Sequence, residues 1–157
     1  MEEQEYRDTY QSVNQRRCVY EKAINSRRCY CTRCHRFNLA DREGVTCNST
    51  TGNAVCTEFL NTLRNKARFS LHLTNTDSPL PHTKEIKVQI GGLLGLQELL
   101  HPERTGSTQV EDIIGLLDTA IERYKRLQNL PYSILVQGVA GFEGRKKRQR
   151  CQSDNPD

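Results

Sequence analysis

Three cysteines fall within six residues of one another, and two more follow farther along the chain, giving the set Cys29, Cys31, Cys34, Cys47 and Cys56. Thiols that are close in sequence can converge on one centre at a small cost in chain entropy, because the loops between them are short. Four thiolates in a tetrahedral array are typical ligands of structural Zn²⁺ and of iron–sulfur clusters. The spacing therefore predicts a thiolate-ligated metal site built from these five residues.

The expected compartment decides how such cysteines are interpreted. The first ten residues, MEEQEYRDTY, lack the pattern of a secretory signal, and the apolar run at 90–100 is too short to span a bilayer. We therefore expect a cytoplasmic protein, where clustered cysteines bind metal or carry redox chemistry more often than they form disulfides. The segment CTRCH at 31–35 matches the pattern for covalent haem attachment, but that reaction normally requires export.

Two metals fit the spacing, and a third reading needs none. Cys31 and Cys34 have the spacing of a zinc knuckle, whereas Cys47 and Cys56 form a second pair that is wider than usual. Zn²⁺ is the expected cofactor. A [4Fe–4S] or [2Fe–2S] cluster is the alternative, with Cys29, Cys31 and Cys34 plus one later cysteine. Redox-active thiols without metal remain the third interpretation, and the roles of Cys18 and His35 stay open.

The N-terminal half is expected to be a unit over residues 1–74. Residues 3–27 contain no Gly or Pro and carry an apolar stripe, which predicts an amphipathic helix. Residues 29–53 lose this periodicity and gain Gly, Asn, Ser and Thr, so they are predicted to form a loop that metal binding would organise. A second helix is predicted over 54–73.

Pro79 and Pro81 mark a linker to a second helical unit over residues 83–143, which we expect to pack on the first as one compact domain. The alternation of apolar residues at 86, 88 and 90 predicts a short β-strand around 85–90, followed by a helix. Thr108 and Glu111 predict a capping box for the next helix, and residues 132–142 are predicted to form a helix or a strand. The expected fold class is mainly α.

Basic residues gather in two places. One group lies among the cysteines, at Arg27, Arg28, Arg33 and Arg36, and the other lies in a tail at 144–157 that is expected to be disordered, at Arg145, Lys146, Lys147, Arg148 and Arg150. Over these few residues only, the tail resembles the basic arm of small RNA-binding viral transactivators. Such groups offset thiolate charge or contact polyanions, so an acidic protein or a nucleic acid is the expected partner.

Signatures of common catalytic sites are absent from the sequence: it contains no Ser-His-Asp pattern, HExxH, Walker motif or paired-carboxylate motif. An enzyme is therefore not indicated. The sequence predicts a small zinc-binding interaction or regulatory protein with a basic surface. The alternatives are an iron–sulfur subunit for electron transfer or redox sensing within a larger complex, and a small thiol redox protein.

Overall fold

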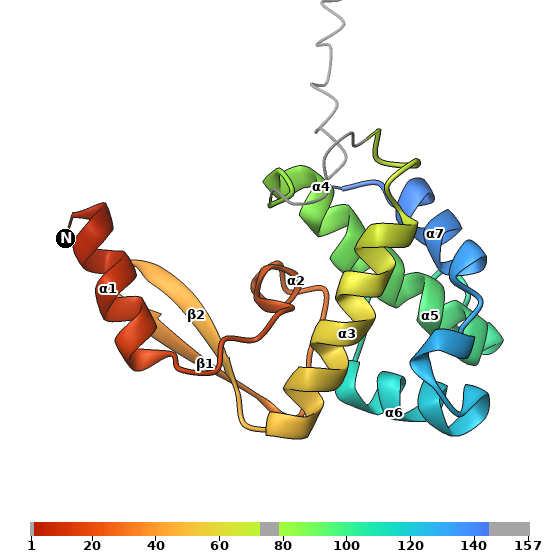
Figure 1. Cartoon of the computed structure of the whole chain (residues 1–157), viewed down its shortest axis with the longest axis horizontal. Helices are drawn as coiled ribbons and strands as arrows, with labels where there is room; N and C mark the ends of the chain where they lie inside the picture. The colour runs from red at the N-terminus through yellow and green to blue at the C-terminus, as the bar shows by residue number, and fades with distance from the viewer. Residues whose placement is uncertain (1, 73–78, 145–157) are drawn as a thin grey trace, which may run out of the picture.

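A computed structural model describes residues 2–72 and 79–144 of the chain. The protein is mainly helical with one two-stranded antiparallel sheet, which confirms the predicted fold class. In Figure 1 the first helix and the sheet form one end of the molecule and the helices from α3 (Thr50–Lys66) onward form the other, with a short helix between them. Within the described residues, no helix is both long and apolar enough to cross a membrane.

The helix predicted over 3–27 is divided into α1 (Glu3–Val13) and α2 (Glu21–Asn25). The buried Asn14 follows α1, and its side-chain amide donates to the carbonyl oxygen of Val45 at 3.1 Å. The backbone beyond it pairs with the sheet, where the Cys18 amide donates to Val45 O at 3.0 Å and the Cys47 amide to Arg16 O at 2.8 Å. These tertiary hydrogen bonds replace the helical ones, which is why the periodic pattern did not produce one long helix.

The predicted loop at 29–53 contains a β-hairpin instead. Its strands are β1 (Cys34–Leu39) and β2 (Arg42–Cys47), paired antiparallel from Cys34 opposite Cys47 to Leu39 opposite Arg42. A Cβ atom at Gly44 would collide with the ring of Phe37 across the pair, so the glycine allows that ring to lie over the backbone. The prediction of a long irregular loop was wrong here, because backbone pairing organises the segment.

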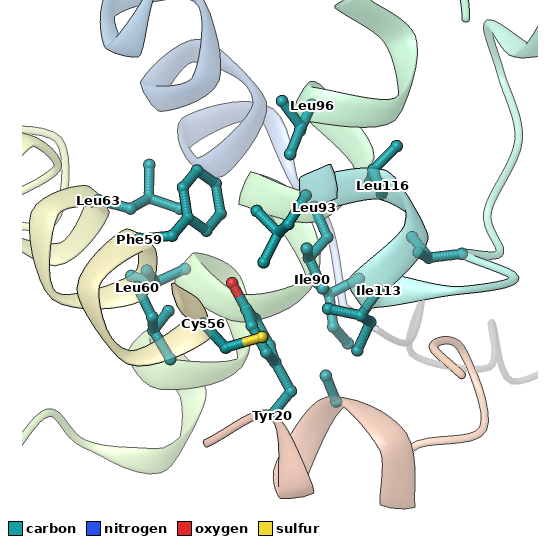
Figure 2. Packing of buried hydrophobic residues seen from close by; sticks show 14 of the residues in the cluster. Tyr20, Cys56, Phe59, Leu60, Leu63, Ile90, Leu93, Leu96, Ile113 and Leu116 are labelled. Carbon is teal, nitrogen blue, oxygen red and sulfur yellow. The ribbon is translucent and has the colours of Figure 1, made fainter. Parts of the chain in front are cut away.

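The helical end consists of α3 (Thr50–Lys66), α5 (Gly92–Leu100), α6 (Ile113–Tyr124) and α7 (Tyr132–Gly141). Figure 2 shows side chains from α3, α5, α6 and the π-helical stretch before α5 (Lys87–Gly91) meeting in the core beside Tyr20, with Phe59, Leu60, Leu63, Ile90, Leu93, Leu96 and Ile113 among them. This buried cluster extends to Ile24 and Val45, so residues of both predicted units share it.

The segment 82–100 is helical throughout, with α4 (His82–Ile86), a π-helical stretch (Lys87–Gly91) and then α5. The β-strand predicted around 85–90 is therefore wrong. The alternation was misleading because two polar residues, Glu85 and Gln89, are buried on the helix face that also carries Ile90. Polar side chains on an inward face hide the helical period from a pattern based on hydrophobicity.

The starts of two helices also differ from the prediction. Ser49 is the N-cap of α3, where its hydroxyl accepts from the Gly52 amide at 2.9 Å, so the helix begins before residue 54. Helix α6 begins at Ile113 with Asp112 as N-cap, and the predicted capping box of Thr108 and Glu111 is not its start. The stretch predicted as helix or strand at 132–142 is α7.

We expect Gly138→Ala to destabilise the fold by about 1–3 kcal/mol, as overpacked sites do. A Cβ atom at Gly138 would lie 2.8 Å from the backbone oxygen of Gly91 and 3.0 Å from Gly95 Cα, so α7 would have to move away from α5. Gly141→Ala is the matched control in the same helix, because a Cβ atom there meets nothing within 4 Å. Urea unfolding checks this, and equal midpoints for the two variants would contradict it.

Candidate metal centre

One small cavity of about 20 Å³ is lined by five cysteines: Cys18, Cys31, Cys34, Cys47 and Cys56. They come from the segment after α1, the turn before β1, the two strands and α3. A space of this size holds about one water molecule and therefore one small ion. Four of the five predicted ligands thus lie together, and Cys18, which the sequence left open, joins them.

Two other sequence candidates lie elsewhere. Cys29 is 1% exposed but does not line the cavity. Its neighbours hold it in an extended segment, because the Val110 amide donates to Arg28 O at 2.8 Å and the Tyr30 amide donates to Val110 O at 2.9 Å. His35 is exposed on β1 and also does not line the cavity.

Backbone pairing brings three of the sulfur-bearing residues together at one end of the hairpin. Cys34 and Cys47 are direct partners in the strand register. The Cys18 amide hydrogen bonds to β2 at Val45 O, and the Cys47 amide hydrogen bonds back to Arg16 O. Their positions are therefore set by the sheet and by the segment that pairs with it, before any ion binds.

The Cys31–Cys34 turn is fastened to the start of α6. Within the turn, the Cys34 amide donates to Cys31 O at 3.2 Å. The Asp112 carboxylate accepts from the Thr32 amide at 2.9 Å and from the Thr32 hydroxyl at 3.2 Å. Asp112 thus acts as a positioning residue that holds the turn over the cavity.

The fifth cysteine lies on α3. Cys56 is 9% exposed, and Figure 2 shows its sulfur beside the ring of Tyr20 in the core. Burial raises the pKa of the Cys56 thiol, and repulsion from Cys18, Cys31 and Cys47 raises it further. Cys56 therefore contacts both the hydrophobic core and the cysteine-lined cavity.

Burial also raises the pKa of three other cysteines around the cavity. It brings the pKa of Cys18 to about 12, with further repulsion from Cys31, Cys47 and Cys34, while the backbone of Tyr20 lowers it. Burial also raises the pKa of Cys31 and Cys34, against lowering by nearby backbone groups. A reactive thiol needs a lowered pKa, so the raised pKa of Cys18, Cys31, Cys34 and Cys56 argues against a nucleophilic role for these four thiols.

As placed in the described residues, no three Cys, His, Asp or Glu side chains have the spacing to hold a metal ion. Tetrahedral Zn²⁺ with Zn–S bonds of about 2.3 Å requires sulfur atoms about 3.8 Å apart. The six cysteines that the structure describes are free thiols. The cysteines around the cavity would therefore have to change position to bind an ion.

The basic residues near the cysteines differ in their surroundings. Arg27 and Arg36 both pair with Glu43 of β2, at 2.7 Å and 3.2 Å. Arg33 is exposed and lines the cysteine cavity, while Arg28 lies over the ring of Phe142. The basic residues predicted at 145–150 lie outside the described residues.

Comparison with protein-family models, with curated proteins and with solved structures found no match. The site is therefore interpreted from its own geometry.

If the cavity binds Zn²⁺, we expect Asp112→Ala to weaken that binding by about 10–100-fold, the usual effect of removing a group that orients a metal ligand. Without the carboxylate, the Thr32 amide loses its partner and the turn that carries Cys31 and Cys34 loosens. Glu111→Ala is the matched control, since that neighbouring carboxylate is exposed and its partner in the described residues is the exposed Arg104. Competition with a chromophoric chelator measures both affinities, and equal values would contradict the positioning role.

Proposed function

We propose that this chain is a small zinc-binding protein in which one Zn²⁺ fastens the N-terminal hairpin to the helical body. The observation that carries the proposal is the convergence of five cysteines on a single small cavity. They come from different elements of the fold. Placing so many thiols around one space is difficult to explain by packing alone, because ordinary apolar side chains would fill the cavity better.

The size of the cavity favours zinc over an iron–sulfur cluster. About 20 Å³ accommodates one ion, whereas a cluster of several iron and sulfide atoms would need a much larger space. Enlarging the cavity would separate β1 and β2 where Cys34 and Cys47 lie opposite each other. Zinc is therefore the proposed metal, and the electron-transfer alternative has less support.

We assign Cys18, Cys31, Cys34 and Cys47 as the ligands, with Cys56 as the fifth, adjacent thiol. The Cys34 amide donates to Cys31 O at 3.2 Å, and the Cys18 amide donates to Val45 O of β2 at 3.0 Å, so backbone contacts hold these three residues at the end of the hairpin. Cys47 is the direct strand partner of Cys34. Cys56, by contrast, lies on α3 and packs in the hydrophobic core beside Tyr20.

Four protein thiolates would leave no open coordination position, as in structural rather than catalytic zinc sites. The role proposed for the metal is therefore to stabilise the fold. The role proposed for the protein is interaction or regulation, with binding surfaces on the fold that the metal holds together.

Metal analysis of protein purified without air tests this proposal. We expect a colourless protein with about one zinc per chain. Broad visible absorption at about 400 nm would show an iron–sulfur cluster instead and overturn the zinc assignment. Protein free of both metals, with unchanged thermal stability after zinc is supplied, would overturn the metal site altogether.

A further inference from the structure

A second, larger cavity lies on another part of the molecule, between the end of α2, the residues after α3, and α4 with the π-helical stretch. Its volume is about 840 Å³, within the usual range of ligand sites. Six of its lining residues are basic or can become so: Arg27, Arg28, His72, His82, Lys84 and Lys87. Among the residues that the structure describes, no Asp or Glu lines this groove.

The positive charges of the groove are only partly neutralised. Arg27 pairs with the exposed Glu43 at 2.7 Å, and Arg28 lies over the Phe142 ring. Within residues 2–72 and 79–144, Lys84 and Lys87 form no ion pair. Opposed basic groups around one cavity favour an anionic ligand, since low-dielectric walls strengthen the field between them.

The floor of the groove is apolar and comes from Leu71, Ile86, Ile90 and Phe142. A phosphate or another small anion would leave this floor uncovered. A peptide that presents apolar side chains to the floor and carboxylates to the rim would satisfy both. The groove therefore has the chemistry of a site for an acidic amphipathic segment.

Single-stranded nucleic acid fits less well. Its recognition relies on aromatic rings that are open for base stacking. The aromatic ring in this groove, Phe142, is 7% exposed and is covered by Arg28.

Gly144 lines the groove, and the sequence that follows it is rich in Arg and Lys. The charge of that sequence therefore does not complement the basic residues of the groove.

We propose that this groove binds an acidic segment of a partner protein, with apolar anchors on the floor and Asp or Glu side chains beside Lys84 and Lys87. The proposal rests on the groove alone and not on the identity of the metal. It selects an acidic protein as the partner, whereas the basic residues in the sequence were compatible with either an acidic protein or a nucleic acid.

A fluorescent pool of degenerate peptides tests it, with apolar residues at the helical spacing i, i+3, i+4 and i+7 and Asp or Glu at the remaining positions. Fluorescence anisotropy with the full-length, metal-loaded chain is expected to show saturable binding that weakens with added salt. The double variant Lys84→Glu/Lys87→Glu should weaken binding by tenfold or more. The matched control Lys125→Glu/Arg126→Glu reverses the same charge at exposed positions outside the groove and should bind as the wild type does.

Several outcomes would overturn the proposal. One is absence of binding by the pool, and another is equal weakening in both double variants. A third is equal binding of a scrambled pool with the same composition, which would indicate charge attraction without a groove. A single-stranded oligonucleotide that binds more tightly and depends on Lys84 and Lys87 would assign the groove to nucleic acid instead. Zinc content measured on the same samples separates these results from a failure of the metal site.

Discussion

Cys31→Ser is expected to lose bound zinc, whereas Cys29→Ser is expected to retain it. The two residues are buried cysteines only two positions apart, but Cys31 lines the cavity and Cys29 does not. Structural zinc sites contribute about 10–16 kcal/mol of apparent binding free energy, so loss of one thiolate should remove most of the metal-dependent stability. Zinc per chain and the thermal midpoint with and without a chelator measure the effect.

The Cys29→Ser variant also controls for the cost of burying a hydroxyl. An unsatisfied buried hydroxyl costs about 1–3 kcal/mol, and this loss should be the same with and without the chelator. Cys18→Ser is expected to behave like Cys31→Ser, and Cys56→Ser is expected to keep its zinc. If Cys29→Ser lost its metal while Cys18→Ser retained it, the assigned ligand set would be wrong.

Arg64→Ala is expected to destabilise the protein by about 3 kcal/mol, the lower end of the range for breaking a buried ion pair, because the Arg64 side chain is 32% exposed. Arg64 of α3 pairs with the buried carboxylate of Glu85 in α4, which also accepts from Gln89 at 2.8 Å. Gln89 in turn accepts from the Ala23 amide at 3.1 Å. Removal of Arg64 leaves a buried carboxylate without its cation and weakens the link between α3, α4 and α2.

The pH dependence identifies the cause of that loss. Burial on its own would raise the pKa of Glu85, but hydrogen bonds from Arg64 and Gln89 lower the pKa overall. A lowered carboxyl pKa contributes stability above the unfolded value of about 4.3, and this stability is lost as the pH falls. The difference in unfolding free energy between wild type and Arg64→Ala should therefore shrink below about pH 4.3. Lys66→Ala, at an exposed position two residues away, is the control and should change little at any pH.

The helices of the core were predictable because their apolar residues recur at helical spacing, as Phe59, Leu60 and Leu63 do in α3. The hairpin was not, since β1 and β2 carry polar residues on both faces and Gly44 interrupts the alternation. The segment around Glu85 was predicted to be a strand because buried polar residues obscured its helical period. Its buried face includes the polar side chains Glu85 and Gln89, which hydrogen bond to each other and to distant partners such as Arg64 and Val19.

The cysteine site could be predicted in outline from spacing, because Cys31 and Cys34 are neighbours in the chain. Cys18 could not be assigned, since a backbone hydrogen bond to Val45, which lies far along the chain, brings it to the cavity. Cys29 has nearly the same sequence context as Cys31, and its pairing with the segment at Val110 is what places it elsewhere. Local spacing identifies the kind of chemistry, and tertiary backbone pairing decides which thiols take part.

X-ray absorption at the zinc edge tests the central claim most directly, because it reports the ligand atoms around the metal in the intact protein. We expect four sulfur neighbours at about 2.3 Å in the wild type and in Cys29→Ser. A shell that contains nitrogen or oxygen at about 2.0–2.1 Å would contradict a four-thiolate site at this cavity.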